Sequence, residues 1–113
     1  MNEVLSVLKG ARELLSDPER WTRGAFARDR KGGPVTPFNP RACQWCVTGA
    51  INATSSIGCA CANRGAALAL WKTLVERGDH TRLVAQFNDD PCTAHADVLA
   101  LLDATIERLE GEQ

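Results

Sequence analysis

Four of the five cysteines in this 113-residue chain could together bind a metal ion, because they fall close together in the sequence. They form two pairs, Cys43 with Cys46 and Cys59 with Cys61, a spacing that a tetrahedral zinc site can close. Structural zinc pairs usually sit on tight turns, whereas the first pair here falls on a predicted helix. Free cysteines also serve as small apolar side chains in protein cores. The sequence therefore favours core packing and no cofactor, with zinc as the alternative.

A second chemistry would use Cys46 as a nucleophile near the start of that predicted helix, where backbone dipoles favour a thiolate. His80 or His95 would act as the base, and Asn88 or Asp89 would orient it. Such residues occur in most chains of this length, and the predicted packing face turns Cys46 inward. We therefore predict no catalytic residue, and a thiol-dependent enzyme is the third hypothesis. Cys92, near the start of the last predicted helix, is expected to be the most reactive thiol.

Charge is distributed unevenly along the chain despite a net charge of −1. Positive residues dominate the span 20–41, and negative residues dominate from residue 89 onward. A basic span with aromatic residues is typical of a surface that binds an acidic protein or a nucleic acid, although a solvated hairpin has the same composition. No recognised nucleic-acid-binding motif is present. The predicted partner-binding residues are Arg20, Trp21, Arg23, Phe26, Arg28, Arg30 and Lys31.

The elements that would position these residues are mostly helical. Apolar spacing predicts a first helix over residues 3–16, followed by a short turn at Asp17 and Pro18. Two short extended runs, at residues 25–28 and 34–36, flank Lys31, Gly32 and Gly33 and predict a small hairpin. Asn39 and Pro40 resemble a cap and a first helical residue, so a second helix is expected from there to Gly58.

The second half of the chain predicts two more helices. One opens at Asn63 and ends at Gly78, with a stripe of Ala67, Leu70, Trp71, Leu74 and Val75. Small residues predict a close contact between this helix and the preceding one, with Cys46, Ala50 and Ala67 between them. Residues 83–87 are expected to be extended. The last helix follows Pro91 or Thr93, with a stripe of Val98, Leu99, Leu102, Ile106 and Leu109.

Length and composition predict one globular domain over residues 1–113. The amphipathic first helix lacks the apolar run of a signal peptide or membrane span, so we expect a cytoplasmic protein with reduced cysteines and no membrane partner. Self-association is left open. The predicted fold is mainly α: a compact four-helix single domain with a small β-hairpin or extended segment between the first two helices.

The chain resembles small bacterial and phage proteins of the domain-of-unknown-function 6197 family. The resemblance rests on Trp21, Thr22, Gly24 and 27–29; on Trp45, Cys46, Gly49 and Ala50; on Phe87, Asn88 and Asp89; and on Val98, Leu99, Leu102, Asp103 and Ile106. Among such sequences the position of Cys46 is the recurrent cysteine, whereas Cys43, Cys59 and Cys61 are outside the pattern. The resemblance therefore argues against a four-cysteine zinc site. The resemblance implies a fold and a bacterial or phage context without a reaction. The predicted function is a non-enzymatic interaction or accessory module for a macromolecular partner; the alternative is a zinc-stabilised accessory or nucleic-acid-binding protein.

Overall fold

The computed structural model describes residues 3–54, 60–78 and 83–111. The chain is mainly helical, as predicted, but the described residues form five α-helices rather than four. In chain order the elements are α1 (Glu3–Leu14), the 3-10 helix η1 (Pro18–Arg20), β1 (Ala27–Arg28), β2 (Pro34–Val35), β3 (Gln44–Trp45), α2 (Val47–Thr54), α3 (Ala60–Glu76), α4 (Val84–Asp89) and α5 (His95–Gly111).

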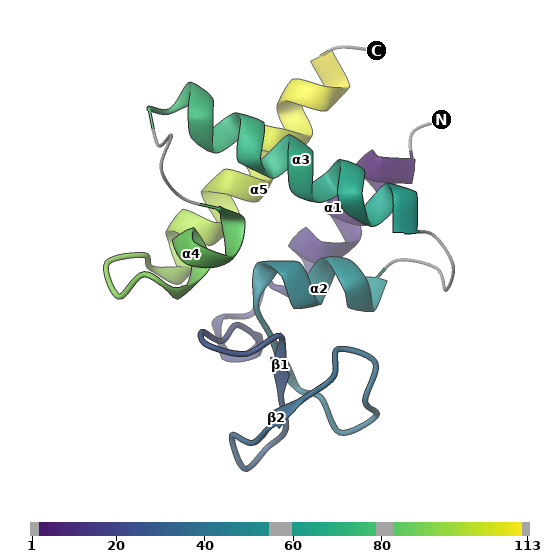
Figure 1. Ribbon diagram of the computed structural model, residues 1–113, viewed down its shortest axis with the longest axis vertical. Helices are drawn as coiled ribbons and strands as arrows, with labels where there is room; N and C mark the ends of the chain where they lie inside the picture. The colour runs from purple at the N-terminus through teal and green to yellow at the C-terminus, as the bar shows by residue number, and fades with distance from the viewer. Residues whose placement is uncertain (1–2, 55–59, 79–82, 112–113) are drawn as a thin grey trace.

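The helices form one body, and the small sheet lies beyond α2 at one end of the molecule's longest axis (Figure 1). Burial of apolar side chains between α1, α2, α3 and α5 is the main force that holds this body together. The largest fully buried apolar side chains are Leu8, Leu15, Leu70, Leu74, Leu101, Leu102, Val47 and Val98. None of the helices in the described ranges is both long enough and apolar enough to cross a membrane.

The predicted hairpin is confirmed, and a third strand joins it. The sheet is antiparallel in the order β2-β1-β3, with Ala27 opposite Val35 on one side and Trp45 on the other. The β1–β2 turn is held by Asp29, whose Oδ1 accepts hydrogen bonds from the backbone N–H groups of Lys31 and Gly33, each at 2.9 Å. A carboxylate that satisfies turn amides in this way fixes a local loop without tertiary support.

The predicted start of the second helix at Asn39 and Pro40 is wrong. The Asn39 side chain instead accepts a hydrogen bond from the Arg41 backbone N–H at 2.8 Å, which closes a local turn. The next residues pair with β1, since the N–H of Cys43 donates to the Arg28 carbonyl at 2.9 Å. Helix α2 begins only at Val47. The predicted stop at Gly58 lies outside the described residues.

The extended segment expected at residues 83–87 is also wrong, because α4 begins at Val84. Val84, Phe87 and Asn88 are all buried, and their spacing of three and four residues matches one helix face. The side chain of Gln86 accepts a hydrogen bond from the Leu83 N–H at 2.8 Å and so satisfies the first turn.

Helix α3 ends as predicted, since Gly78 adopts a left-handed φ of +88°. Its predicted stripe is only partly correct, because Leu70 and Leu74 are buried whereas Ala67 and Trp71 are exposed. The expected close contact between α2 and α3 through Ala67 is therefore wrong. Helix α2 packs chiefly on α1, where a Cβ on Gly10 would lie 3.1 Å from the Cβ of Thr54.

Candidate functional site

Trp45, Cys46, Gly49 and Ala50 mark the junction where β3 runs into α2. Trp45 pairs with Ala27 in the sheet, and its indole N–H donates to the Pro37 carbonyl at 3.2 Å. Ala50, one turn into α2, is fully buried in the core. This motif therefore links the sheet to the helical body.

Gly49 allows the segment before β1 to lie directly on the first turn of α2. A Cβ placed on Gly49 would come within 1.8 Å of the Phe26 carbonyl oxygen, a distance that no side chain can tolerate. The same oxygen accepts a hydrogen bond from the Cys46 N–H at 3.2 Å. Backbone contact of this kind fixes Phe26 next to Cys46.

Cys46 occupies the position just before α2, and its Sγ accepts a hydrogen bond from the Gly49 N–H at 3.2 Å. The side chain is 5% exposed, as the inward-facing prediction requires. Burial raises the pKa of the Cys46 thiol above 9.0, and the nearby Asp89 carboxylate adds to the increase, whereas the amides of Gly49 and Thr48 offset part of it. The thiol is therefore neutral near pH 7.

Asn88 connects three segments that meet behind this junction, and it is completely buried. Its Oδ1 accepts hydrogen bonds from the Trp21 indole at 2.8 Å and from the Val47 N–H at 3.1 Å. Its Nδ2 donates to the Thr22 carbonyl at 3.1 Å and to Asp89 Oδ1 at 3.0 Å. All four hydrogen-bonding positions of the amide are thus used. The sequence marked Asn88 as part of the family resemblance and as a possible partner of a catalytic histidine, but not as the centre of this network.

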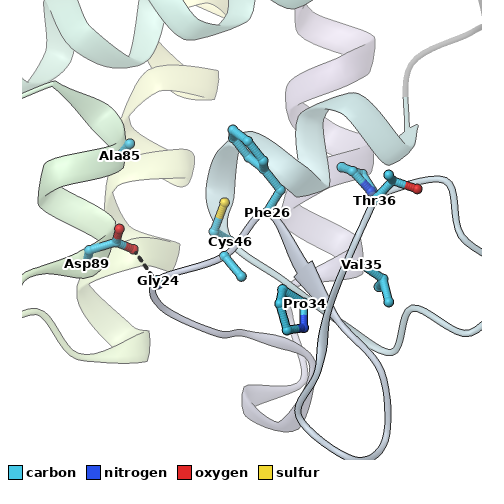
Figure 2. A pocket seen from close by; sticks show the side chains of 10 residues that line it. Gly24, Phe26, Pro34, Val35, Thr36, Cys46, Ala85 and Asp89 are labelled. Carbon is cyan, nitrogen blue, oxygen red and sulfur yellow. Dashed lines mark hydrogen bonds between the residues drawn. The ribbon is translucent and has the colours of Figure 1, made fainter.

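Asp89 follows Asn88 on α4 and reaches across to the opposite loop. Its Oδ1 accepts a hydrogen bond from the Gly24 N–H at 2.9 Å, as Figure 2 shows. This bond and the one from Asn88 hold the carboxylate in one orientation. No described residue donates a hydrogen bond to the second oxygen, Oδ2.

These residues surround a cleft of about 550 Å³ between the sheet and α4 (Figure 2). Its walls are mostly apolar, and the Cys46 sulfur and the Asp89 carboxylate lie on it. Phe26 is 57% exposed at this cleft, an unusual state for a phenylalanine. The lining residues are Gly24, Ala25, Phe26, Pro34, Val35, Thr36, Pro37, Cys46, Ala85 and Asp89.

The candidate base His95 does not line this cleft. Its Nε2 lies 2.6 Å from the Leu15 carbonyl oxygen, and its ring centroid lies 6.0 Å from that of Trp21. Both contacts hold His95 at the boundary of the core, away from Cys46 and the cleft. His80 lies outside the described residues.

The four candidate zinc ligands are only partly described. Cys43 is half-buried beside β3, Cys46 is buried, and both are free thiols. Cys59 and the side chain of Cys61 lie outside the described residues. Elsewhere in the described chain, no three potential ligand side chains gather in one place.

Several of the predicted partner-binding residues support the fold. The Trp21 indole is bound to Asn88, and the Arg23 guanidinium lies 4.5 Å from the Trp21 ring centroid and donates to the Thr93 carbonyl. Arg28 donates hydrogen bonds to Thr22 Oγ1 and to the carbonyls of Gly32 and Arg23, at 2.8–3.0 Å. These contacts tie the hairpin to the preceding loop.

The exposed cations of the basic span are Arg20, Arg23, Arg30, Lys31 and Arg41, and of these Arg23 is held by Trp21 and Thr93. A second hollow, of about 660 Å³, is lined by Asp29, Arg30, Lys31, Pro40, Arg41, Ala42 and Cys43. It shares no lining residue with the apolar cleft. We call Arg30, Lys31 and Arg41 the basic tip.

Comparison with known families accounts for nearly the whole chain. The model of the family of unknown function DUF6197 matches residues 1–108. The chain belongs to this family. The match confirms the resemblance drawn from the sequence, and no curated protein or solved structure matched the chain.

The motifs that suggested DUF6197 now have structural explanations. The Trp21 indole donates to Asn88, the Gly49 N–H in the first turn of α2 donates to Cys46 Sγ, and Asp89 accepts from the Gly24 N–H. The Phe87-Asn88-Asp89 run was the sequence signal for this network. It did not reveal the roles of Asn88 and Asp89, because they depend on which loop lies against α4.

Proposed function

We propose that this DUF6197 protein is a non-enzymatic interaction module that binds an acidic segment of a partner protein through the basic tip. The observation that carries the proposal is the convergence of Arg30, Lys31 and Arg41 on one hollow. Arg30 and Lys31 come from the β1–β2 turn, and Arg41 comes from the segment that leads to β3. A concave surface with three cations raises the local concentration of negatively charged ligands and speeds encounter with an acidic partner.

The basic tip is not neutralised from within the described part of the chain. No described carboxylate forms an ion pair with Arg30, Lys31 or Arg41, and Asp29 directs its Oδ1 to the amides of the turn. By contrast, Lys9 pairs with Glu110 at 2.9 Å, and Arg12 pairs with Asp103 at 2.8 Å. The cations of the basic tip thus remain available for an external anion.

An acidic protein segment fits this surface better than a nucleic acid does. The chain has an isoelectric point of about 6.1, whereas nucleic-acid-binding domains are usually strongly basic. Trp21, the tryptophan of the basic span, is half-buried, its indole N–H donates to Asn88, and Arg23 lies over its ring. The test below therefore includes a nucleic acid as a second probe, and binding of that probe alone would contradict the proposal.

The test uses two fluorescent probes, a glutamate-rich peptide and a single-stranded oligonucleotide, with fluorescence anisotropy at low and high salt. We expect the peptide to bind, its affinity to fall as salt rises, and the double variant Lys31→Glu, Arg41→Glu to lose binding. The matched control is Arg64→Glu, Lys72→Glu, which makes the same charge change at exposed positions on α3. Equal loss in both variants, or binding of the oligonucleotide alone, would contradict the proposal.

The thiol enzyme has less support, because burial raises the pKa of Cys46 and His95 lies at Leu15 and Trp21 rather than at the cleft.

We propose the cytoplasm as the compartment, because Cys43, Cys46 and Cys92 are free thiols and a reducing environment preserves that state.

A further inference from the structure

We propose that the apolar cleft between the sheet and α4 is a binding site for a small organic cation that has an apolar body and an ammonium group. This site is separate from the basic tip and rests on different residues. The cleft volume of about 550 Å³ falls within the range of about 300–1,000 Å³ that is typical of small-molecule sites.

The shape and lining of the cleft select the apolar body. Phe26, Pro34, Val35, Pro37 and Ala85 supply apolar walls from both sides of the cleft. Phe26 is 57% exposed, so a ligand that covers its ring would remove apolar surface from water. The Phe26 backbone is fixed by its contact with Gly49, so the ring starts from a rigid support.

The charge of the cleft selects the cation. Asp89 is the charged residue among those that line the cleft, and the remaining polar side chains there belong to Thr36 and Cys46. Hydrogen bonds from Gly24 and Asn88 to Oδ1 fix the carboxylate, so a ligand pays little entropy to order it. Oδ2 receives no hydrogen bond from the described residues. An ammonium group can donate to that oxygen, and the ring of Phe26 offers a further electrostatic attraction.

The Cys46 thiol suits an apolar ligand rather than a reactive one. It is neutral near pH 7, because burial raises its pKa, and its Sγ already accepts the Gly49 N–H. It therefore contributes a soft apolar surface to the cleft.

The first experiment compares three probes of similar size on the unmodified protein: 2-phenylethylammonium, 2-phenylethanol and 3-phenylpropanoate. Binding is followed by NMR titration of the backbone amides of Gly24 and Cys46. We expect the ammonium to bind about tenfold more tightly than the alcohol, because a charged hydrogen bond is stronger than a neutral one, and the carboxylate to bind weakest. Equal affinities for all three probes, or no shift at either amide, would overturn the proposal without any variant being needed.

Two variants then locate the site. Asp89→Asn keeps an oxygen for the Gly24 N–H but removes the charge, so it should reduce ammonium affinity about tenfold and leave alcohol affinity unchanged. Phe26→Ala should weaken both probes. The matched controls are Glu107→Gln, an exposed carboxylate on α5, and Phe38→Ala, a phenylalanine that is 63% exposed but does not line the cleft. If the controls weaken the ammonium probe as much as the cleft variants do, the site lies elsewhere and the proposal fails.

Discussion

At the scale of single residues, Cys46 shows two opposing effects on one thiol. The first turn of α2 offers N–H groups that stabilise a thiolate, and Sγ does accept one of them. Burial opposes ionisation, and burial is the larger effect because the pKa is raised overall. A cysteine at a helix start is therefore not necessarily a nucleophile, since the same position can be closed to water.

We expect Cys46 to react with iodoacetamide at least about tenfold more slowly than Cys92, because the thiolate is the reactive form and Cys92 is exposed. Mass mapping of the native protein at pH 7 measures both rates. Rapid, selective modification of Cys46 would contradict the prediction and support the thiol enzyme.

The raised pKa of Cys46 also makes the free energy of unfolding depend on pH. The folded state holds the Cys46 thiol proton more tightly than the unfolded state, in which the pKa of the thiol is near 9.0. Protonation of Cys46 therefore stabilises the folded state fully below pH 9.0. The free energy of unfolding should therefore fall as the pH rises above 9.0 and through the higher folded-state pKa. Cys46→Ser keeps a capping oxygen and removes this titration, so its denaturation curves should lose that alkaline fall.

At the scale of elements, the approach of β1 to α2 depends on the absence of a side chain at Gly49. Gly49→Ala should lower the free energy of unfolding by about 3 kcal/mol or more, because its Cβ meets a backbone oxygen that cannot rotate away. Urea denaturation measures the loss. The control is Gly111→Ala, where a new Cβ meets nothing within 4 Å. A Gly49→Ala variant as stable as the parent would show that the sheet and α2 can separate.

The long helices were predictable from sequence, and so were the β1–β2 hairpin and the turn at Asp17 and Pro18, but β3 and α4 were not. The apolar periodicity of α1, α3 and α5 spans three or more turns, and Gly78 supplies a clear stop. Strand β3 has two residues, too few for a period, and its pairing partner is distant in sequence. The sequence therefore predicted one helix from Asn39 to Gly58 that would carry Cys43 and Cys46, although α2 begins only at Val47.

The candidate site was predictable to a similar degree. The inward orientation of Cys46 was predicted from sequence, and Cys92, which was expected to be the most reactive thiol, is exposed. The cleft did not, because it forms where the loop before β1 meets α4, and α4 was expected to be extended. The sequence predicted Trp21, Arg23 and Arg28 alike as partner-binding residues. In the structure each of them makes contacts within the protein that only the fold creates.

At the scale of the whole molecule, the uneven charge along the chain is partly cancelled by folding. The acidic last helix lies against α1, where Asp103 and Glu110 pair with Arg12 and Lys9. On the sheet, the basic tip has no such partners among the described residues. Folding thus neutralises part of the acidic last helix and leaves the basic tip without an ion pair among the described residues.

The two α1–α5 ion pairs should contribute little stability despite their short distances. The side chains of Asp103 and Glu110 are 52% and 48% exposed, so water and salt screen the attraction. We expect the double variant Asp103→Asn, Glu110→Gln to lose no more than about 1 kcal/mol of unfolding free energy, and less at high salt. Urea denaturation at about 50 mM and about 500 mM salt measures the loss, because the screening length differs about threefold between these concentrations.

The matched control for these ion pairs is Glu13→Gln, Glu107→Gln, which removes two exposed charges that make no ion pair with the described residues. Its stability should match the parent at both salt concentrations. A salt-independent loss of more than about 2 kcal/mol in the α1–α5 variant alone would show that charge rather than apolar burial joins these helices. The expected small loss has a consequence for the proposed binding. An acidic partner could compete for Lys9 and Arg12 without unfolding the helical body, so the preference that we propose for the basic tip rests on the lack of internal pairing there.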